Sequence, residues 1–217
     1  MSIKGVIFDL DGTLLDTLDD ITVNANGVLA SFGFCSRSKD EYRYLAGQGV
    51  YSLLASASGC EDQKLVSSMV DEFKKKYEKN DGLSKPFEGI FDVLKLLDKK
   101  AVKKCVLSNK PDALTKLCIQ KYFEEYRFDV VVGQQDGVPI KPDAVSALNI
   151  ADELGLKRSE IIMVGDSKND ILTAKNGGFY SIGVTWGFRD RAELLDNGAD
   201  AIADSPLELA QLLLIKP

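Results

Sequence analysis

The chain has 217 residues, 45% of them hydrophobic and 28% charged, as expected of an ordinary soluble globular protein. Its formal net charge of −6 argues against nucleic acid as a main partner, because that affinity depends on Lys and Arg neutralising phosphates. The sequence contains no histidine, which excludes Ser-His-Asp and Cys-His catalysis and His-ligated zinc, so any chemistry depends on carboxylates, lysines, hydroxyls and a metal ion.

Short apolar segments alternate with amphipathic ones along most of the chain. Such alternation predicts an α/β fold, with a doubly wound parallel sheet covered by helices on both faces. The segment from Ile90 to Leu97, for example, carries apolar side chains at helical spacing. The predicted strands are 6–8, 102–107, 130–132, 161–164, 181–184 and a weak strand at 201–202.

The first crossover is much longer than the others. About ninety residues separate the first two predicted strands, whereas a βαβ crossover needs only a dozen or more. The inserted segment has a helical pattern, and Ser38–Glu41 is a predicted capping box. We therefore assign residues 17–82 to a small helical cap domain, and 1–16 with 83–217 to the core. The expected connections are 14–18 and 80–85.

Carboxylates follow two of the predicted strands. Asp9 and Asp11 come after strand 6–8, and alternate side chains of an extended segment point the same way, so these carboxylates can converge. Such crowding is costly unless a cation or a proton is bound. Asp166 follows strand 161–164, and Asp170 comes four residues later. The plainer interpretations are an Asp-Gly turn for the first pair and helix N-caps for the second.

Other polar residues complete the pattern. Ser108 and Asn109 follow strand 102–107, where they could also simply start a helix, and Lys141 could be a solvated loop charge. Open α/β sheets, however, bind ligands beyond the carboxyl ends of their strands. If strand 6–8 is central, with 102–107 and 161–164 on its two sides, one pocket is faced by Asp9, Asp11, Ser108 and Asp166.

These segments, in this order and spacing, resemble the four motifs of the haloacid dehalogenase superfamily. The segments are Asp9-Leu10-Asp11-Gly12-Thr13, Ser108-Asn109, Lys141-Pro142 and Gly165-Asp166-Ser167-Lys168-Asn169-Asp170. The helical insertion is similar to that superfamily's C1-type cap. The segments 183–189 and 197–200 are similar to its phosphoglycolate phosphatase branch. The resemblance covers nearly the whole chain.

The resemblance implies a Mg²⁺-dependent phosphatase that hydrolyses a small phosphorylated metabolite, such as a phosphoglycolate-like monoester. Asp9 would be the nucleophile and form an aspartyl phosphate, and Asp11 would act as general acid and then as general base. Mg²⁺ would be held by the carboxylates of Asp9 and Asp166 and by the backbone carbonyl of Asp11. Asp170 would reach the metal through a water molecule or orient Lys141.

The same resemblance implies that Lys141, Ser108 and, with less support from the residues, Asn109 bind the transferring phosphoryl group. Candidates for specificity contacts in the cap are Arg43, Gln48 and Tyr51, for which helix packing or a solvated charge is the plainer interpretation. Weaker candidates on the core side are Lys110 and 186–189.

Other functions remain open on this scaffold. Pyrophosphatase and nucleotidase activity would use identical catalytic residues. A sugar-phosphate mutase is disfavoured because members of that branch carry a histidine early in the cap, and a non-catalytic phosphate-binding module is disfavoured because every catalytic position holds a suitable residue.

The remaining expectations concern location and thiols. No apolar run suggests a signal peptide or a membrane span, which predicts a cytoplasmic protein. The four cysteines form no C-x-x-C pair and are expected to be reduced. The sequence does not predict the oligomeric state.

Overall fold

A computed structural model describes residues 3–79 and 82–215. Within these residues, six parallel strands form one sheet in the order β5-β4-β1-β6-β7-β8. This arrangement confirms the predicted α/β fold with a doubly wound parallel sheet. The strands are β1 (Gly5–Phe8), β4 (Lys103–Pro111), β5 (Val130–Gln134), β6 (Ile161–Gly165), β7 (Tyr180–Val184) and β8 (Ala201–Ala203).

Strand β1 lies in the interior of the sheet, between β4 and β6. It pairs in parallel with β4 on one side and with β6 on the other, as the sequence predicted. All its residues are buried: Val6 and Phe8 belong to one core cluster and Ile7 to the other. Because the strand order reverses at β1, the carboxyl end of this strand is the position where open α/β sheets bind ligands.

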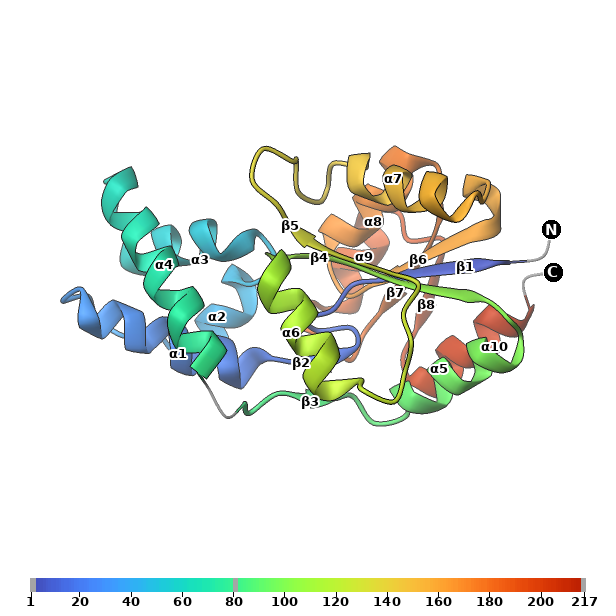
Figure 1. Ribbon diagram of the computed structural model, residues 1–217, viewed down its shortest axis with the longest axis horizontal. Helices are drawn as coiled ribbons and strands as arrows, with labels where there is room; N and C mark the ends of the chain where they lie inside the picture. The colour runs from blue at the N-terminus through green and yellow to red at the C-terminus, as the bar shows by residue number, and fades with distance from the viewer. Residues whose placement is uncertain (1–2, 80–81, 216–217) are drawn as a thin grey trace.

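Helices cover both faces of the sheet (Figure 1). On one face, α5 (Ile90–Lys99), α6 (Asp112–Tyr122) and α10 (Pro206–Ile215) pack against the larger core cluster. On the other face lie α7 (Val145–Leu154) and α8 (Lys168–Gly177), and α9 (Arg191–Asp196) contacts β7 and β8. The predicted apolar stripe of α5 is buried, because its side chains recur on one side of the helix: Ile90, Val93, Leu94 and Leu97.

Strand β4 is longer than predicted. It continues past Leu107 to Pro111, with a shift in its register against β5 between these two residues. Ser108 and Asn109 therefore lie within the end of the strand and not at the start of a helix. The apolar pattern could not show this, because it ends at Leu107, whereas the pairing with β5 resumes at Pro111 after three polar residues.

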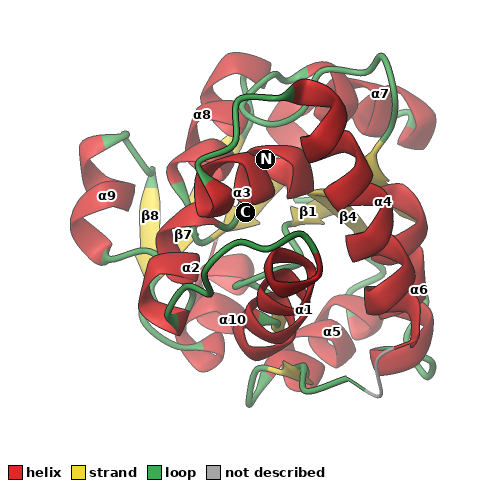
Figure 2. Ribbon diagram, turned by 90° about the vertical axis from the view of Figure 1, so that its left-hand side faces the viewer, coloured by secondary structure: helices red, strands yellow, loops and turns green. Residues whose placement is uncertain are grey.

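Four helices follow β1 before the chain reaches α5, counted within the described residues. They are α1 (Leu18–Ser31), α2 (Lys39–Leu45), α3 (Gly49–Ser58) and α4 (Gln63–Lys79), and we call them the cap helices. They lie together at one end of the sheet, on the left in Figure 1 and towards the viewer in Figure 2. The predicted capping box starts α2: the Glu41 amide donates to Ser38 Oγ (3.2 Å), and the Ser38 amide donates to the Glu41 carboxylate (2.8 Å).

The two segments that connect the cap helices to the sheet are tied to each other. They form a short antiparallel ribbon of β2 (Leu15–Asp16) and β3 (Lys85–Pro86). Beside it, the buried Asp20 of α1 accepts hydrogen bonds from the amides of Leu83 (2.7 Å) and Ser84 (2.8 Å). The sequence did not predict this ribbon, because two-residue strands show no periodicity. Residues 80–81 of the predicted connection lie outside the described residues.

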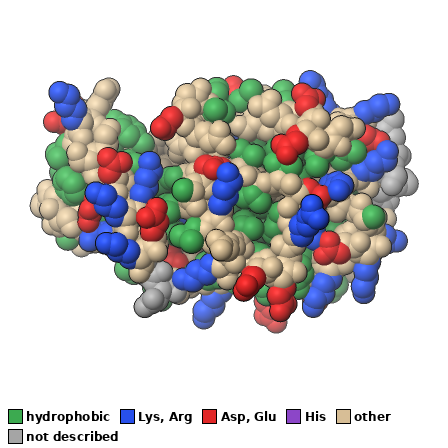
Figure 3. Space-filling model, viewed as in Figure 1, with side chains coloured by type: hydrophobic (Ala, Val, Ile, Leu, Met, Phe, Trp, Pro, Cys, Tyr) green, Lys and Arg blue, Asp and Glu red, His purple; other side chains and the backbone are tan. Residues whose placement is uncertain are grey.

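Charges of both signs are interspersed over the face seen in Figure 3, which carries no large patch of one sign. The cap and sheet regions both show Lys and Arg next to Asp and Glu on this face. None of the helices in the described ranges combines the length and the apolar content needed to cross a bilayer.

Candidate active site

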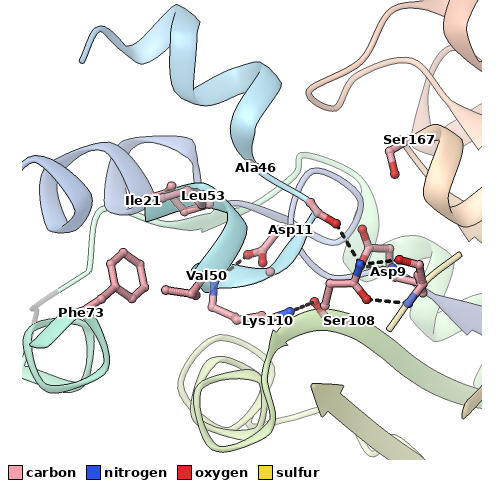
Figure 4. Close-up of a pocket in the computed structure, with 14 residues that line it drawn as sticks. Asp9, Asp11, Ile21, Ala46, Val50, Leu53, Phe73, Ser108, Lys110 and Ser167 are labelled. Atoms are coloured by element: carbon pink, nitrogen blue, oxygen red, sulfur yellow. Dashed lines mark hydrogen bonds and ion pairs between the residues drawn. The ribbon is translucent and has the colours of Figure 1, made fainter. Parts of the chain in front are cut away.

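A cavity open to solvent lies between the carboxyl ends of the central strands and the cap helices. Asp9 and Asp11 follow β1, and Ser108 lies at the end of β4, so the structure brings these three predicted residues together (Figure 4). The sheet side of the wall is polar and is completed by Asn109, Lys110, Lys141 and Ser167. The cap side consists of Ile21, Ala46, Gly47, Gly49, Val50, Leu53 and Phe73.

Three buried carboxylates meet beside this cavity. Asp9, Asp166 and Asp170 each place one oxygen within 4.8 Å of the others. The sheet explains the meeting of the first two, since Phe8 and Val164 are register partners and the Asp9 amide donates to the Val164 carbonyl (2.9 Å). Asp9 therefore follows β1 opposite the end of β6, and Asp166 comes directly after β6.

Lys141 is in contact with two of these three carboxylates. Its Nζ lies 2.7 Å from Asp9 Oδ1 and 2.6 Å from Asp170 Oδ1. Only 3% of the Lys141 side chain is exposed, so the plainer interpretation of a solvated loop charge is wrong. The buried lysine is stabilised by two ion pairs, which is the usual condition for a buried charge.

The charge around Lys141 is not balanced. Burial raises the pKa of Asp9 well above its usual range against the lowering effect of Lys141, and the charges of Asp170 and Asp166 raise it further. Burial and the nearby Asp170 raise the pKa of Asp166 to about 7. One lysine in contact with two of the three clustered carboxylates leaves negative charge that a divalent cation would neutralise, and carboxylate oxygens suit Mg²⁺. The residues present thus fit the predicted metal.

Neighbouring groups hold Asp166 in place. Thr13 Oγ1 donates to Asp166 Oδ1 (3.3 Å), and the Phe188 amide donates to Asp166 Oδ2 (2.7 Å). Gly12 has a φ of +85°, and a Cβ at this position would lie 2.7 Å from Asp166 Cγ, so a side chain there would displace the carboxylate. The sequence placed Thr13 in the first motif and Phe188 in the candidate segment 186–189, but it predicted neither contact with Asp166, and no side-chain pattern could reveal a contact made by a backbone amide.

Asp170 contacts both Lys141 and the start of α8. Its Oδ1 pairs with Lys141, while its Oδ2 accepts from the amide (3.1 Å) and hydroxyl (2.7 Å) of Ser167, the N-cap residue of α8. It is therefore part of a helix cap and also orients Lys141. The alternative contact with the metal through a water molecule stays a prediction.

Asn109 holds the backbone of Lys141. Its Oδ1 accepts from the Lys141 amide (2.9 Å), and its Nδ2 donates to the Lys141 carbonyl (3.0 Å) and to the Gly47 carbonyl (2.9 Å). Its amide group is thus engaged on both atoms and fixes the lysine loop. The predicted contact of Asn109 with the substrate stays a prediction.

Asp11 points away from the group of three carboxylates. Its Oδ1 lies 2.8 Å from Lys110 Nζ, and this lysine also lies over the Tyr77 ring, 4.4 Å from its centroid. The predicted metal contact of Asp11 involves its backbone carbonyl and stays a prediction. The Lys110 side chain is only 4% exposed, so this weaker candidate lies inside the site next to Asp11.

The core holds the loop between α2 and α3 at several points. Arg189 donates to the carbonyls of Tyr44 (2.9 Å) and Ala46 (2.8 Å) and also bonds the Arg43 carbonyl. Asn169 Nδ2 joins Asn109 in donating to the Gly47 carbonyl, at 3.0 Å. The predicted specificity contacts are not found: in the described residues, the cavity wall contains none of Arg43, Gln48 and Tyr51.

Replacing Arg189 with Met should release this loop. The change removes charge-assisted hydrogen bonds to three carbonyls, each worth roughly 1.5–3 kcal/mol. We expect amide hydrogen exchange over residues 42–48 to rise at least about tenfold, measured by mass spectrometry. Arg191→Met, which removes an exposed ion pair with Asp204, is the matched control and should leave this exchange unchanged. Unchanged exchange in Arg189→Met would show that the loop is held by other contacts.

Comparison with known proteins identifies related sequences and structures over almost the entire chain. The sequence model of a family described as haloacid dehalogenase-like hydrolase matches residues 6–184. A phosphoglycolate phosphatase of Xylella fastidiosa is 31% identical over 97% of this chain and 91% of its own length. An N-acetylmuramic acid 6-phosphate phosphatase of Pseudomonas aeruginosa is 29% identical, over 98% and 96%. The crystal structure of a provisionally assigned phosphoglycolate phosphatase from Lactobacillus delbrueckii subsp. bulgaricus is 30% identical, with a TM-score of 0.88 over 98% of this chain and 99% of that one.

Proposed function

The chain belongs to the haloacid dehalogenase-like hydrolases and is a phosphoric monoester hydrolase, and from this premise we propose a Mg²⁺-dependent phosphatase that forms an aspartyl phosphate on Asp9. The observation that carries the proposal is the contact of Lys141 with Asp9 beside two further buried carboxylates. The substrate is a small phosphorylated metabolite, and the name of the Xylella relative makes 2-phosphoglycolate the reference compound. The setting would be the cytoplasm.

The reaction proceeds in two displacements at phosphorus. A carboxylate oxygen of Asp9 attacks the phosphorus, and the bond from phosphorus to the ester oxygen breaks. Asp11 gives its proton to the departing alkoxide, which leaves as the alcohol. Water then attacks the aspartyl phosphate, Asp11 takes a proton from that water, and inorganic phosphate leaves as the Asp9 carboxylate is restored. Both residues line the cavity, as these roles require.

The remaining residues reduce the repulsion between two anions. Lys141 neutralises charge on Asp9 and on the phosphoryl oxygens, and Asp170 and Asn109 keep it in position. Ser108 would donate its hydroxyl to the phosphoryl group. The carboxylates of Asp9 and Asp166, with the Asp11 carbonyl, would hold Mg²⁺, which supplies further neutralisation of the phosphoryl charge when bound.

Turnover of p-nitrophenyl phosphate by the purified chain tests the proposal. We expect release of p-nitrophenol with Mg²⁺, a loss of at least about 100-fold on adding a chelator, and recovery with excess Mg²⁺, because three clustered carboxylates without the ion repel the substrate. A matched reaction with a non-chelating buffer anion controls for ionic strength. Absence of turnover under all conditions would indicate a phosphate-binding module and would refute the proposal.

A further inference from the structure

The cavity next to Asp9 has two chemically different sides (Figure 4). Asp9, Asp11, Ser108 and Lys110 lie towards the sheet, and the opposite wall is formed by α1, α3 and α4. No side chain that these cap helices and their loops place on the described cavity wall is charged or can form a hydrogen bond. The large side chains of this wall are Ile21, Val50, Leu53 and Phe73.

The backbone carbonyl groups of the loop between α2 and α3 already accept hydrogen bonds from the core. The Ala46 carbonyl accepts from Arg189, and the Gly47 carbonyl accepts from Asn109 and Asn169. These two residues line the cavity, and their carbonyl groups are thus bound to core side chains. A hydroxyl group on the leaving alcohol would have to share these carbonyl acceptors with their present donors. An alkyl group needs no hydrogen-bond partner.

The two lysines on the cavity wall are neutralised by the protein itself. Lys110 pairs with Asp11, and Lys141 pairs with Asp9 and Asp170. A carboxylate on the leaving alcohol would therefore lie against apolar side chains unless it broke the ion pair of Lys110 or reached the amides at the start of α3. Removing a charge from water without a partner of its own is unfavourable.

We infer that the preferred substrate is the phosphomonoester of a neutral alcohol with an apolar body, which the cap recognises through Ile21, Val50, Leu53 and Phe73. This inference depends on the proposed phosphatase function and specifies the leaving group. The four side chains come from α1, α3 and α4, so the apolar wall spans three helices of the cap.

Matched pairs of substrates test the inference with the wild-type chain and Mg²⁺. Ethyl phosphate is compared with 2-phosphoglycolate, and propyl phosphate with glycerol 1-phosphate, so that each pair differs by the polar groups of the alcohol. We expect kcat/KM to be at least about tenfold higher for the alkyl member of each pair. From ethyl to butyl phosphate, kcat/KM should rise about threefold to fourfold per methylene group.

A single added hydroxyl on the wall provides the second test. Val50→Thr keeps the side-chain shape but adds a polar group, and should lower the ratio of kcat/KM for butyl phosphate to that for glycerol 1-phosphate at least about threefold. Val66→Thr makes the same change at a buried position of α4 away from the cavity and should leave the ratio unchanged. Because the ratio compares two substrates in one preparation, partial unfolding of a variant does not affect it.

Two results would overturn the inference. If 2-phosphoglycolate is hydrolysed as well as ethyl phosphate or better, Lys110 or the amides at the start of α3 bind its carboxylate and the apolar wall does not set the preference. An unchanged ratio in Val50→Thr would likewise exclude recognition by this wall. Failure to hydrolyse any of the esters, including p-nitrophenyl phosphate, would instead refute the phosphatase proposal on which the inference depends.

Discussion

Asp9→Asn should lower kcat by about 10⁴-fold or more, the scale of loss seen when an enzyme loses its nucleophile. The amide keeps the volume of the side chain but has no anionic oxygen to attack phosphorus, so the covalent intermediate cannot form. Lys141 would still pair with Asp170 in this variant, and the number of clustered carboxylates would fall, so we expect the fold to persist. Initial rates with p-nitrophenyl phosphate and Mg²⁺ measure the effect, and thermal unfolding checks the fold.

A carboxylate outside the site provides the control for this variant. Asp196 is exposed at the end of α9, and Asp196→Asn should retain the wild-type rate. Wild-type protein quenched in acid during turnover should also carry a phosphoryl group on the peptide that contains Asp9, and Asp9→Asn should not. Substantial residual activity in Asp9→Asn, or a phosphoryl group on another residue, would assign the nucleophile elsewhere.

The sequence allowed the sheet and most of its chemistry to be predicted, because both depend on local patterns. Strands buried on both faces appear as short apolar runs. Polar residues directly after such runs must lie at the carboxyl ends of the strands in a parallel sheet. Asp9 and Asp166 are 157 positions apart in the chain, yet β1 pairs with β6 and their carboxylates each place an oxygen within 4.8 Å of the other. The predicted catalytic roles came from the order and spacing of the four motifs, which resemble those of the haloacid dehalogenase superfamily.

The sequence could not show contacts whose partners are backbone atoms. Arg189 and Asn169 hold the loop between α2 and α3 through its carbonyl groups, and Phe188 holds Asp166 through its amide. In each contact one partner is a backbone atom, so the sequence shows no pair of complementary side chains. The same limit affects the cap contacts: Arg43 and Tyr51 were considered for their chemistry, but the cavity wall there is made of aliphatic and aromatic side chains that also fit an ordinary core.

Lys141→Met should impair both stability and catalysis. The lysine is buried between Asp9 and Asp170, and breaking a buried pair by removing one partner costs roughly 3–5 kcal/mol. The loss of positive charge beside the nucleophile should also lower kcat by about 10²–10³-fold. Urea unfolding in the presence of a chelator measures the first effect, and initial rates at saturating Mg²⁺ measure the second.

The destabilisation should depend on pH in a defined direction. Burial already raises the pKa of Asp9 while Lys141 lowers it, so removing the lysine raises this pKa further above its unfolded value. The folded variant then binds more protons than the unfolded chain, and its stability falls as pH increases. We therefore expect the difference in unfolding free energy between Lys141→Met and the wild type to be larger at pH 8 than at pH 5.

Lys104 offers a matched control for this variant, because it is a buried lysine at the opposite end of β4. Its partner Asp98 is 54% exposed, so water can solvate that carboxylate when the lysine is removed. Lys104→Met should therefore cost less stability than Lys141→Met and leave kcat unchanged. If Lys141→Met lost stability but kept the wild-type kcat, this lysine would serve only to hold the acidic residues together, and the charge on the transferring phosphoryl group would have to be neutralised by other groups.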